Sequence, residues 1–216
     1  MLVPVPLLRK MELALLAPQL SRHDVEAGCV LAARYDCVSV FVKPHYVEVA
    51  RKVLKDTHIK IVAPIGFPHG GVTTATKMYE TQDLYQRGAD ELALVINVGA
   101  VRDHDDLAVK NDIQGVIKTA RGKPITVILE TPLLSPDDQA RAAKLAQAAG
   151  ATMVMTATGF APTATTLADV RLLRATCPTL KVRATCGSAS QPEALAMLEA
   201  GAALVVLDDI EKTLST

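Results

Sequence analysis

Short runs of aliphatic and β-branched residues alternate with longer stretches of helical period along the whole chain. Consecutive parallel strands need a long crossover between them, so this regular alternation is typical of a parallel α/β fold. The strand patterns cover residues 11 to 16, 38 to 42, 59 to 65, 91 to 97, 125 to 130, 152 to 156, 180 to 184 and 203 to 207. The helix patterns cover 22 to 35, 45 to 55, 74 to 87, 103 to 120, 136 to 148, 165 to 175, 191 to 200 and 209 to 214.

Three of the helix patterns end in the same way. Gly88, Gly150 and Gly201 each follow a helix and precede a strand, where a left-handed C-cap is expected. The 216 residues allow about 27 for each of eight repeats, close to the roughly 31 of a typical (β/α)8 barrel. A doubly wound open sheet is the competing fold, but the first strand is not followed by GxGxxG and no linker divides the chain. The sequence therefore predicts a compact (β/α)8 TIM barrel, with residues 1–216 as a single domain.

Composition narrows the classes of partner. Lys plus Arg and Asp plus Glu both number 23, and aromatic residues make up only 3% of the chain, so neither a basic surface nor stacking platforms for nucleic acid are expected. No apolar run is long enough to cross a membrane. The four cysteines have no CxxC spacing, which favours a reducing cytoplasm over a disulfide framework. These features predict a cytoplasmic protein that binds a small molecule.

In a TIM barrel the chemistry lies at the carboxyl ends of the strands, and strand alternation decides which side chains point inward. Glu130 follows an apolar strand and Arg183 lies inside one, so each charge needs a partner. We expect the two to meet in the barrel mouth, either in contact with substrate or as a purely structural ion pair. The other polar residues expected to bind substrate at the strand ends are Glu12, Asn97, Thr156, Thr158, Thr185, Asp208 and Asp209.

Several segments carry a specific family resemblance. They are VSVFVKPHYVEVARKVL at 38 to 54, IVAPIGFPHGGVTTATKMYETQDL at 61 to 84, GADELALVINVGAV at 88 to 101, VILETPLL at 127 to 134 and MVMTATGFAPTATTLADVRLLR at 153 to 174. Together they span nearly the whole chain, and it resembles the deoxyribose-phosphate aldolase family. The resemblance implies a (β/α)8 barrel. It also implies carbon–carbon bond cleavage or formation through a lysine Schiff base on a phosphorylated sugar.

The residues that the resemblance implies for this chemistry are replaced. The Schiff-base lysine is expected where this chain has Met155, and a thioether forms no imine. The second lysine is Arg183, which keeps its charge and is no nucleophile at neutral pH. The proton-relaying aspartate is Ala93, and the first-strand DHT or DLT pattern reads Glu12, Leu13 and Ala14.

Phosphate recognition is also altered. The resemblance implies a small Gly-Thr-Ser-Ser or Gly-Ala-Ser-Ser turn, but the corresponding stretch ends in Asp208 and Asp209. Two carboxylates repel an anion at that position, although simple helix capping explains them equally well. Phe41 and Met155 make the barrel interior more apolar, and Lys43 is predicted to point into the mouth as a replacement amine or as a cation. Exposure to solvent at the end of the strand is the alternative for Lys43.

The leading hypothesis is an aldolase-like enzyme acting on a non-phosphorylated, partly apolar carbonyl compound by addition, elimination, cyclisation or retro-aldol cleavage. Glu130 would act as acid or base, and Arg183 or Lys43 would hold an oxyanion. One alternative is a noncatalytic relative that binds a ligand or partner, and the other is an aldolase with its Schiff-base lysine relocated to Lys43. No cofactor or metal site is predicted, and the resemblance suggests a homodimer.

Overall fold

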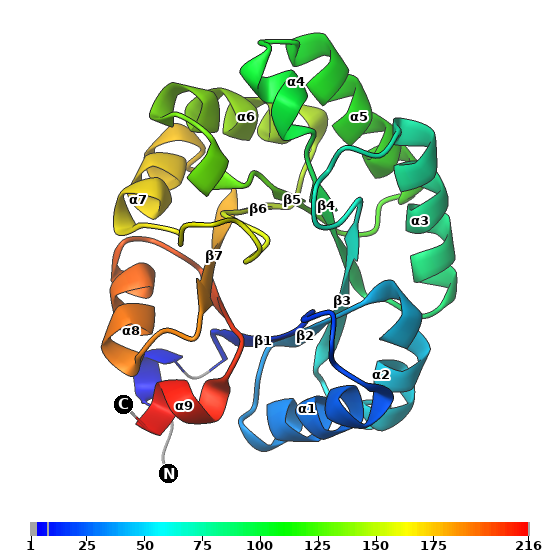
Figure 1. The fold of residues 1–216 in the computed structure, drawn as a ribbon, viewed down its shortest axis with the longest axis vertical. Helices are drawn as coiled ribbons and strands as arrows, with labels where there is room; N and C mark the ends of the chain where they lie inside the picture. The colour runs from blue at the N-terminus through cyan, green and yellow to red at the C-terminus, as the bar shows by residue number, and fades with distance from the viewer. Residues whose placement is uncertain (1–3, 8, 216) are drawn as a thin grey trace.

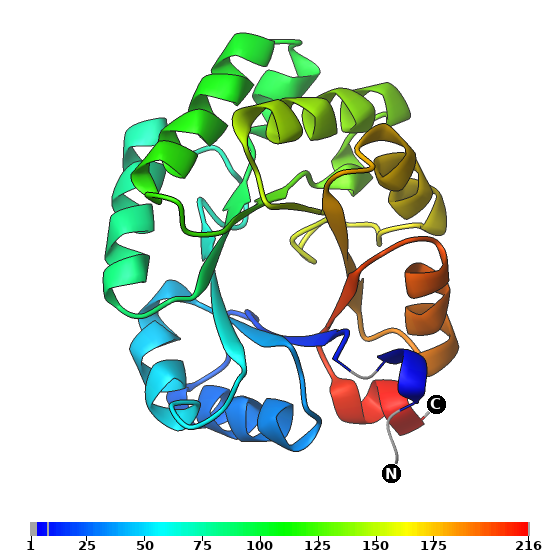
Figure 2. The ribbon, with the colours of Figure 1, turned by 180° about the vertical axis from the view of Figure 1, so that it is seen from behind.

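The strands close into a parallel barrel in the computed structural model, which describes residues 4–7 and 9–215 (Figures 1 and 2). They are β1 (Met11–Leu15), β2 (Ser39–Val42), β3 (Lys60–Ile65), β4 (Glu91–Val95), β5 (Ile125–Ile128), β6 (Met153–Met155), β7 (Lys181–Gly187) and β8 (Leu204–Leu207). Each pairs with its neighbour in sequence, and β8 closes the barrel on β1, with Met11 opposite Val205. The predicted (β/α)8 TIM barrel is confirmed.

The helices surround the barrel. They are α1 (Arg22–Arg34), α2 (Val47–Val53), α3 (Thr74–Gln86), α4 (Val98–Arg102), α5 (Asp106–Thr119), α6 (Pro136–Ala149), α7 (Leu167–Thr176), α8 (Gln191–Glu199) and α9 (Ile210–Ser215). Short 3-10 helices add η1 (Val5–Leu7), η2 (Pro44–Tyr46) and η3 (Thr131–Leu133). Gly88, Gly150 and Gly201 all have positive φ, as predicted for the left-handed ends of α3, α6 and α8.

One short helix was missing from the prediction. The pattern from 103 to 120 corresponds to α5, which begins at Asp106, whereas α4 ends at Arg102 and lies where no helix was predicted. Asn97 caps α4 through the amide of Ala100, and Asp105 caps α5 through the amide of Ala108. Each cap satisfies a free backbone amide in the first turn of its own helix, which allows two helices to begin close together in the sequence.

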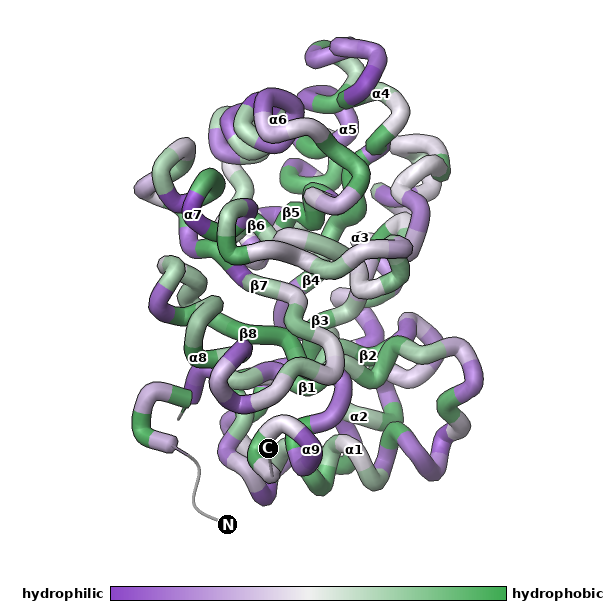
Figure 3. Tube along the Cα trace, turned by 60° about the vertical axis from the view of Figure 1, so that its left-hand side comes forward, coloured by the Kyte–Doolittle hydropathy of each residue, from purple (hydrophilic) through white to green (hydrophobic). Residues whose placement is uncertain are grey.

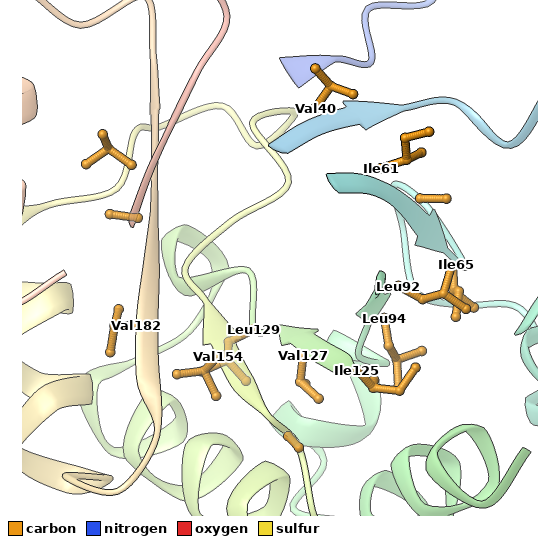
Figure 4. Packing of buried hydrophobic residues seen from close by; sticks show 14 of the residues in the cluster. Val40, Ile61, Ile65, Leu92, Leu94, Ile125, Val127, Leu129, Val154 and Val182 are labelled. Atoms are coloured by element: carbon orange, nitrogen blue, oxygen red, sulfur yellow. The ribbon is translucent and has the colours of Figure 1, made fainter. Parts of the chain in front are cut away.

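Apolar side chains fill two regions on either side of the barrel wall. The larger region lies between the strands and the helices, and includes Val127, Val154 and Leu94 from neighbouring strands (Figure 4). The smaller region fills the barrel interior and contains Phe41 and Met155. Figure 3 shows the strands as a mainly hydrophobic band, with hydrophilic segments on the surrounding helices. Strands buried on both faces explain why their sequences read as continuous apolar runs.

Among residues 4–7 and 9–215, no helix combines the length and the apolar character that a membrane span requires.

Candidate active site at the carboxyl ends of the strands

Glu130 lies directly after β5, at the carboxyl end of the barrel, and its side chain is buried. Both carboxylate oxygens are 3.2 Å from the backbone nitrogen of Thr158, which donates to them. Burial raises the pKa of Glu130 above the ordinary carboxyl value, and the hydrogen bonds from Thr158 offset part of that rise. A carboxyl group whose pKa is raised toward neutrality is suited to proton transfer.

The backbone of Glu130 is also unusual. Its φ is 56°, in the left-handed region that non-glycine residues seldom occupy. The other non-glycine residues with positive φ in the described chain are partly or fully exposed: Arg9, Asp36, His104 and Arg121. A buried residue held in this conformation is stabilised by its surroundings, and such positions are enriched at functional sites.

Threonine side chains fasten the loop between β6 and α7 to the barrel. The Thr156 hydroxyl lies 2.8 Å from that of Thr165 and accepts a hydrogen bond from the Thr185 amide. The Thr185 hydroxyl in turn donates to the carbonyl oxygen of Ala157. Thr156, Thr158 and Thr185 were predicted to bind substrate because they lie at the ends of strands. The structure brings them together beside Glu130, with the hydroxyl groups of Thr156 and Thr185 bonded within the protein.

The β6–α7 loop reaches over the end of the barrel (Figure 1). There, the Phe160 ring meets that of Phe67, from the loop after β3, edge to face at 5.3 Å. The Phe160 amide donates to the Thr158 hydroxyl, and Phe67 packs on the apolar cluster of the interior. The aromatic pair therefore joins loops from two non-adjacent strands above the mouth.

An apolar layer lies below the mouth. Phe41 and Met155 are almost fully buried in it, and their neighbours include Ala93, Ile128 and Val206. Met155 stands opposite Arg183 in the pairing of β6 with β7. The position where the family resemblance places a reactive lysine is therefore occupied by a thioether in apolar surroundings.

Arg183 points toward the amino-terminal ends of the strands. Its Nε lies 2.6 Å from Glu12 and its Nη1 lies 2.7 Å from Glu91, the second residue of β1 and the first of β4. The Thr126 hydroxyl accepts a further bond, and Ser39 donates to Glu12 at 2.6 Å. Each of these side chains is at least nine-tenths buried. They form a charged layer beneath the apolar one.

The predicted meeting of Arg183 with Glu130 is therefore wrong. Strand parity correctly places both residues on the inner side of the barrel, but the guanidinium binds Glu12 and Glu91 at one end while Glu130 binds Thr158 at the other. The same correction applies to Glu12, which was expected to bind substrate at a strand end and instead pairs with Arg183. Burial raises the pKa of Glu12, an effect that the nearby Arg183 charge opposes.

Lys43 is bound by the loop after β1. Its Nζ donates to the carbonyl oxygens of Ala17, Pro18 and Leu20 at 2.9, 3.1 and 3.0 Å. Three acceptors use all three protons of an ammonium group, whereas a nucleophilic amine needs a free lone pair. This geometry favours a role for Lys43 in loop structure over the replacement amine that the sequence suggested.

We expect Lys43→Met to loosen the β1–α1 loop. Three carbonyl oxygens, two of them partly buried, would lose their common donor, and the free energy of unfolding should fall by about 1 to 3 kcal/mol. Amide hydrogen exchange should accelerate at residues 17 to 21 while exchange in β5 stays unchanged. Unaltered protection of that loop would show that the three bonds contribute nothing to its order.

The remaining predicted residues cap helices or face solvent. Asn97 caps α4, and Asp209 accepts from the Lys212 amide at 2.9 Å, which supports helix capping, the alternative explanation for Asp209. Asp208 is exposed just after β8 and lies close to Gly187. If Gly187 carried a Cβ atom, that atom would be 3.5 Å from Oδ2 of Asp208. Partial burial of its carboxyl group raises the pKa of Asp208.

Three buried charged residues were not predicted: Glu91, Lys77 and Asp112. Glu91 lies two positions before the inward-facing Ala93, so strand parity is the signal that could have identified it. Lys77 is fully buried outside the barrel wall, where its Nζ donates to the carbonyl oxygen of Val95 and to Asp112 at 2.5 Å. Lys77 belongs to the family-like segment at 61 to 84, but the sequence does not reveal that Asp112 of α5 neutralises its charge.

Neither thiols nor a metal cluster supplies another reactive centre in the described chain. Burial raises the pKa of Cys29, Cys37 and Cys186 to about 12, so their thiols stay protonated at neutral pH. No group of three or more His, Cys, Asp or Glu side chains within residues 4–7 and 9–215 is arranged to hold a metal ion.

A closed parallel barrel with a buried carboxyl group at the carboxyl ends of its strands defines the class: a (β/α)8 barrel with a candidate active site where such barrels carry their chemistry. The structures it resembles agree. An aldolase designated QR15 superposes with a TM-score of 0.90 at 29% identity, covering 95% of this chain and 92% of that one. A tetrameric deoxyribose phosphate aldolase from Aeropyrum pernix superposes with a TM-score of 0.89 at 26% identity, covering 97% and 89%.

Sequence comparison identifies the family. The deoxyribose-phosphate aldolase of Streptococcus sanguinis strain SK36 is 42% identical over 189 residues, covering 87% of this chain and 86% of the relative. The deoxyribose-phosphate aldolase of Staphylococcus haemolyticus strain JCSC1435 is 41% identical over 189 residues, again covering 87% of this chain and 86% of the relative. No protein-family model matches. The chain belongs to the deoxyribose-phosphate aldolase family and is an aldolase-like lyase.

Proposed function

We propose that the protein acts on a non-phosphorylated, partly apolar carbonyl compound, with Glu130 as the acid or base and without a lysine imine. The observation that carries the proposal is the Glu130 carboxyl group, which is buried, has a raised pKa and is aimed by the Thr158 amide. A carboxylate in this setting removes a proton from the carbon beside a carbonyl or from a β-hydroxyl group. Retro-aldol cleavage, elimination and cyclisation all begin with one of these steps.

The absence of an imine is supported by the environment of three side chains. Met155 stands at the position expected for the reactive lysine. Lys43 donates to three carbonyl oxygens, and Lys77 is paired with Asp112 outside the barrel wall. We propose that Arg183 also remains outside the chemistry, because Glu12 and Glu91 occupy its guanidinium.

The choice of an uncharged substrate is supported by the end of β8. Asp208 is exposed where the family resemblance implies a phosphate-binding turn. A carboxylate repels a phosphate group, and the apolar layer of Phe41 and Met155 favours a substrate with hydrocarbon character.

Exchange of carbonyl α-protons for deuterium tests this proposal without knowledge of the natural substrate. Proton NMR in D₂O with propanal, 2-butanone and 2-deoxyribose should show protein-dependent exchange that Glu130→Gln lowers by about 100-fold or more. The melting temperature should change by only a few degrees, because the amide keeps the shape of the carboxyl group. Since a base must be deprotonated, the wild-type rate should rise with pH through a midpoint above 4.5.

The control for this experiment is Glu199→Gln, an exposed carboxylate at the end of α8. It should leave the exchange rate unchanged. Deoxyribose 5-phosphate should release no acetaldehyde above background. Exchange that survives in Glu130→Gln would remove Glu130 from the mechanism, and cleavage of the phosphorylated sugar would contradict the proposed substrate class.

A noncatalytic ligand-binding relative is the second candidate. It is supported by the replacement of three positions at once, Met155, Arg183 and Ala93, and by threonine hydroxyls committed to loop structure. This candidate predicts saturable binding of a carbonyl compound without α-proton exchange. We also propose a cytoplasmic homodimer, which light scattering after size-exclusion chromatography would distinguish from the tetramer named for the Aeropyrum pernix relative.

A further inference from the structure

A cavity of about 530 Å³ lies outside the barrel wall, between the loop leading into α7 and the face of α8. Most of its lining is apolar and includes Leu167 from α7 and Ala189, Ala196 and Met197 from the loop before α8 and from α8 itself. These four side chains are partly exposed. We call this cavity the α7–α8 groove. Partly exposed apolar surface that forms a concavity is typical of a binding site.

The groove shares part of its lining with a smaller cavity next to the candidate active site. A smaller cavity of about 180 Å³ lies under the β6–α7 loop and shares Ala164, Thr165, Thr185 and Cys186 with the groove. Its lining also includes Ala157 and Gly159, the residues on either side of Thr158. The Thr158 amide is the group that holds the Glu130 carboxylate. Small and apolar lining residues of the two cavities therefore extend from the neighbours of Thr158 to Met197.

Charge at the groove favours an uncharged occupant. Glu193 is the only ionisable lining residue apart from the Cys186 thiol, and its carboxylate accepts from the Ser190 amide and hydroxyl at 2.7 and 2.8 Å. Asp208 stands beside Gly187, which lines the smaller cavity. Among the residues that the structure describes, no cation lines either cavity. Phosphates and carboxylates would meet only negative charge along this path.

We propose that the α7–α8 groove binds the alkyl chain of a straight-chain aldehyde or ketone whose carbonyl group lies at Glu130. This inference rests on the proposed function for the position of the carbonyl group, and it names the substrate class as a neutral aliphatic carbonyl compound. The chain runs beneath the β6–α7 loop and reaches α8, where Ala196 and Met197 contact its end.

A homologous series of ketones measures the contribution of the chain. Isothermal titration with 2-butanone, 2-hexanone and 2-octanone should show Kd falling by about tenfold for each added pair of methylenes, because each buried methylene strengthens binding. Ala196→Phe and Ala189→Phe each fill the groove and should remove most of this dependence on chain length. Ala33→Phe, at an exposed position on α1, is the matched control and should retain it.

The readouts separate this inference from the proposed function. Chain-length-dependent binding without α-proton exchange would support the groove and overturn the proposed chemistry. Exchange whose rate and affinity do not depend on chain length would leave the chemistry standing and overturn the groove. The groove would also be overturned if both filled variants were folded, as judged by melting temperature, and kept the wild-type dependence of Kd on chain length. Dimerisation through the groove that excludes 2-octanone would overturn it as well.

Discussion

Arg183→Met is expected to lower the free energy of unfolding by about 3 to 5 kcal/mol. The substitution leaves Glu12 and Glu91 buried in the barrel interior without the guanidinium that binds both. Thr126 and Ser39 would still donate to these carboxylates, but neutral hydroxyl groups do not replace a buried positive charge. Urea denaturation followed by circular dichroism measures the change.

The pH dependence of Arg183→Met identifies the cause. Without the arginine, burial and mutual repulsion raise the pKa of both carboxyl groups in the folded state above that in the unfolded chain. The penalty is therefore present at pH above the folded-state values, and it diminishes as the pH falls through them and the groups become neutral. Arg183→Met combined with Glu12→Gln and Glu91→Gln should recover most of the lost stability at pH 7, because no unpaired charge remains.

An exposed ion pair provides the comparison. Arg9→Met breaks the surface contact with Asp36 and should change stability far less. A wild-type denaturation midpoint for Arg183→Met would mean that water or another cation compensates the two carboxylates, and the charged layer would then contribute nothing to folding.

The fold could be predicted because its determinants are local and repeated. Strands buried on both faces must be apolar throughout, and glycines such as Gly150 mark the helix ends through a conformation that other residues seldom adopt. The short helix α4 was missed because its five residues are too few to show a helical period. Its capping residue, Asn97, was counted with the strand pattern that ends there.

The candidate site was predicted in part. Strand parity correctly assigned Phe41, Met155 and Arg183 to the barrel interior, because successive side chains point to opposite faces. Parity does not determine the direction along the barrel axis that a long side chain takes. Arg183 extends toward the amino-terminal ends because Glu12 and Glu91 lie there, and the position of Glu91 relative to Glu12 depends on the register of the closed barrel.

Lys43 illustrates a second limit. Its spacing from Phe41 predicted an inward side chain, but β2 ends at Val42 and the strand alternation ends with it. Carbonyl oxygens of the β1–α1 loop then determine where the ammonium group lies. Backbone acceptors are present at every residue, so a sequence pattern does not show where three of them converge.

Met155→Lys is expected to create an imine-forming amine where the wild-type barrel has none. The new side chain would lie among Phe41, Ile128 and Val206, opposite Arg183 on β7. Burial in apolar surroundings lowers the pKa of an amine and so increases the neutral fraction that can react. Its nitrogen would attack the acetaldehyde carbonyl carbon, water would leave, and borohydride would reduce the resulting imine to a stable ethyl adduct.

Peptide mass spectrometry locates the adduct, and the wild-type protein should carry none on a barrel residue. Met153→Lys is the matched control, because it places an amine on the same strand two residues nearer the charged layer and farther from the mouth of the barrel. An adduct on Lys43 in the wild type would instead support the relocated imine. Even with labelling at position 155, we expect no cleavage of deoxyribose 5-phosphate, because Asp208 still opposes the phosphate group. The proposed function treats the loss of the amine and the loss of phosphate recognition as separate changes, so restoring one should leave the other in force.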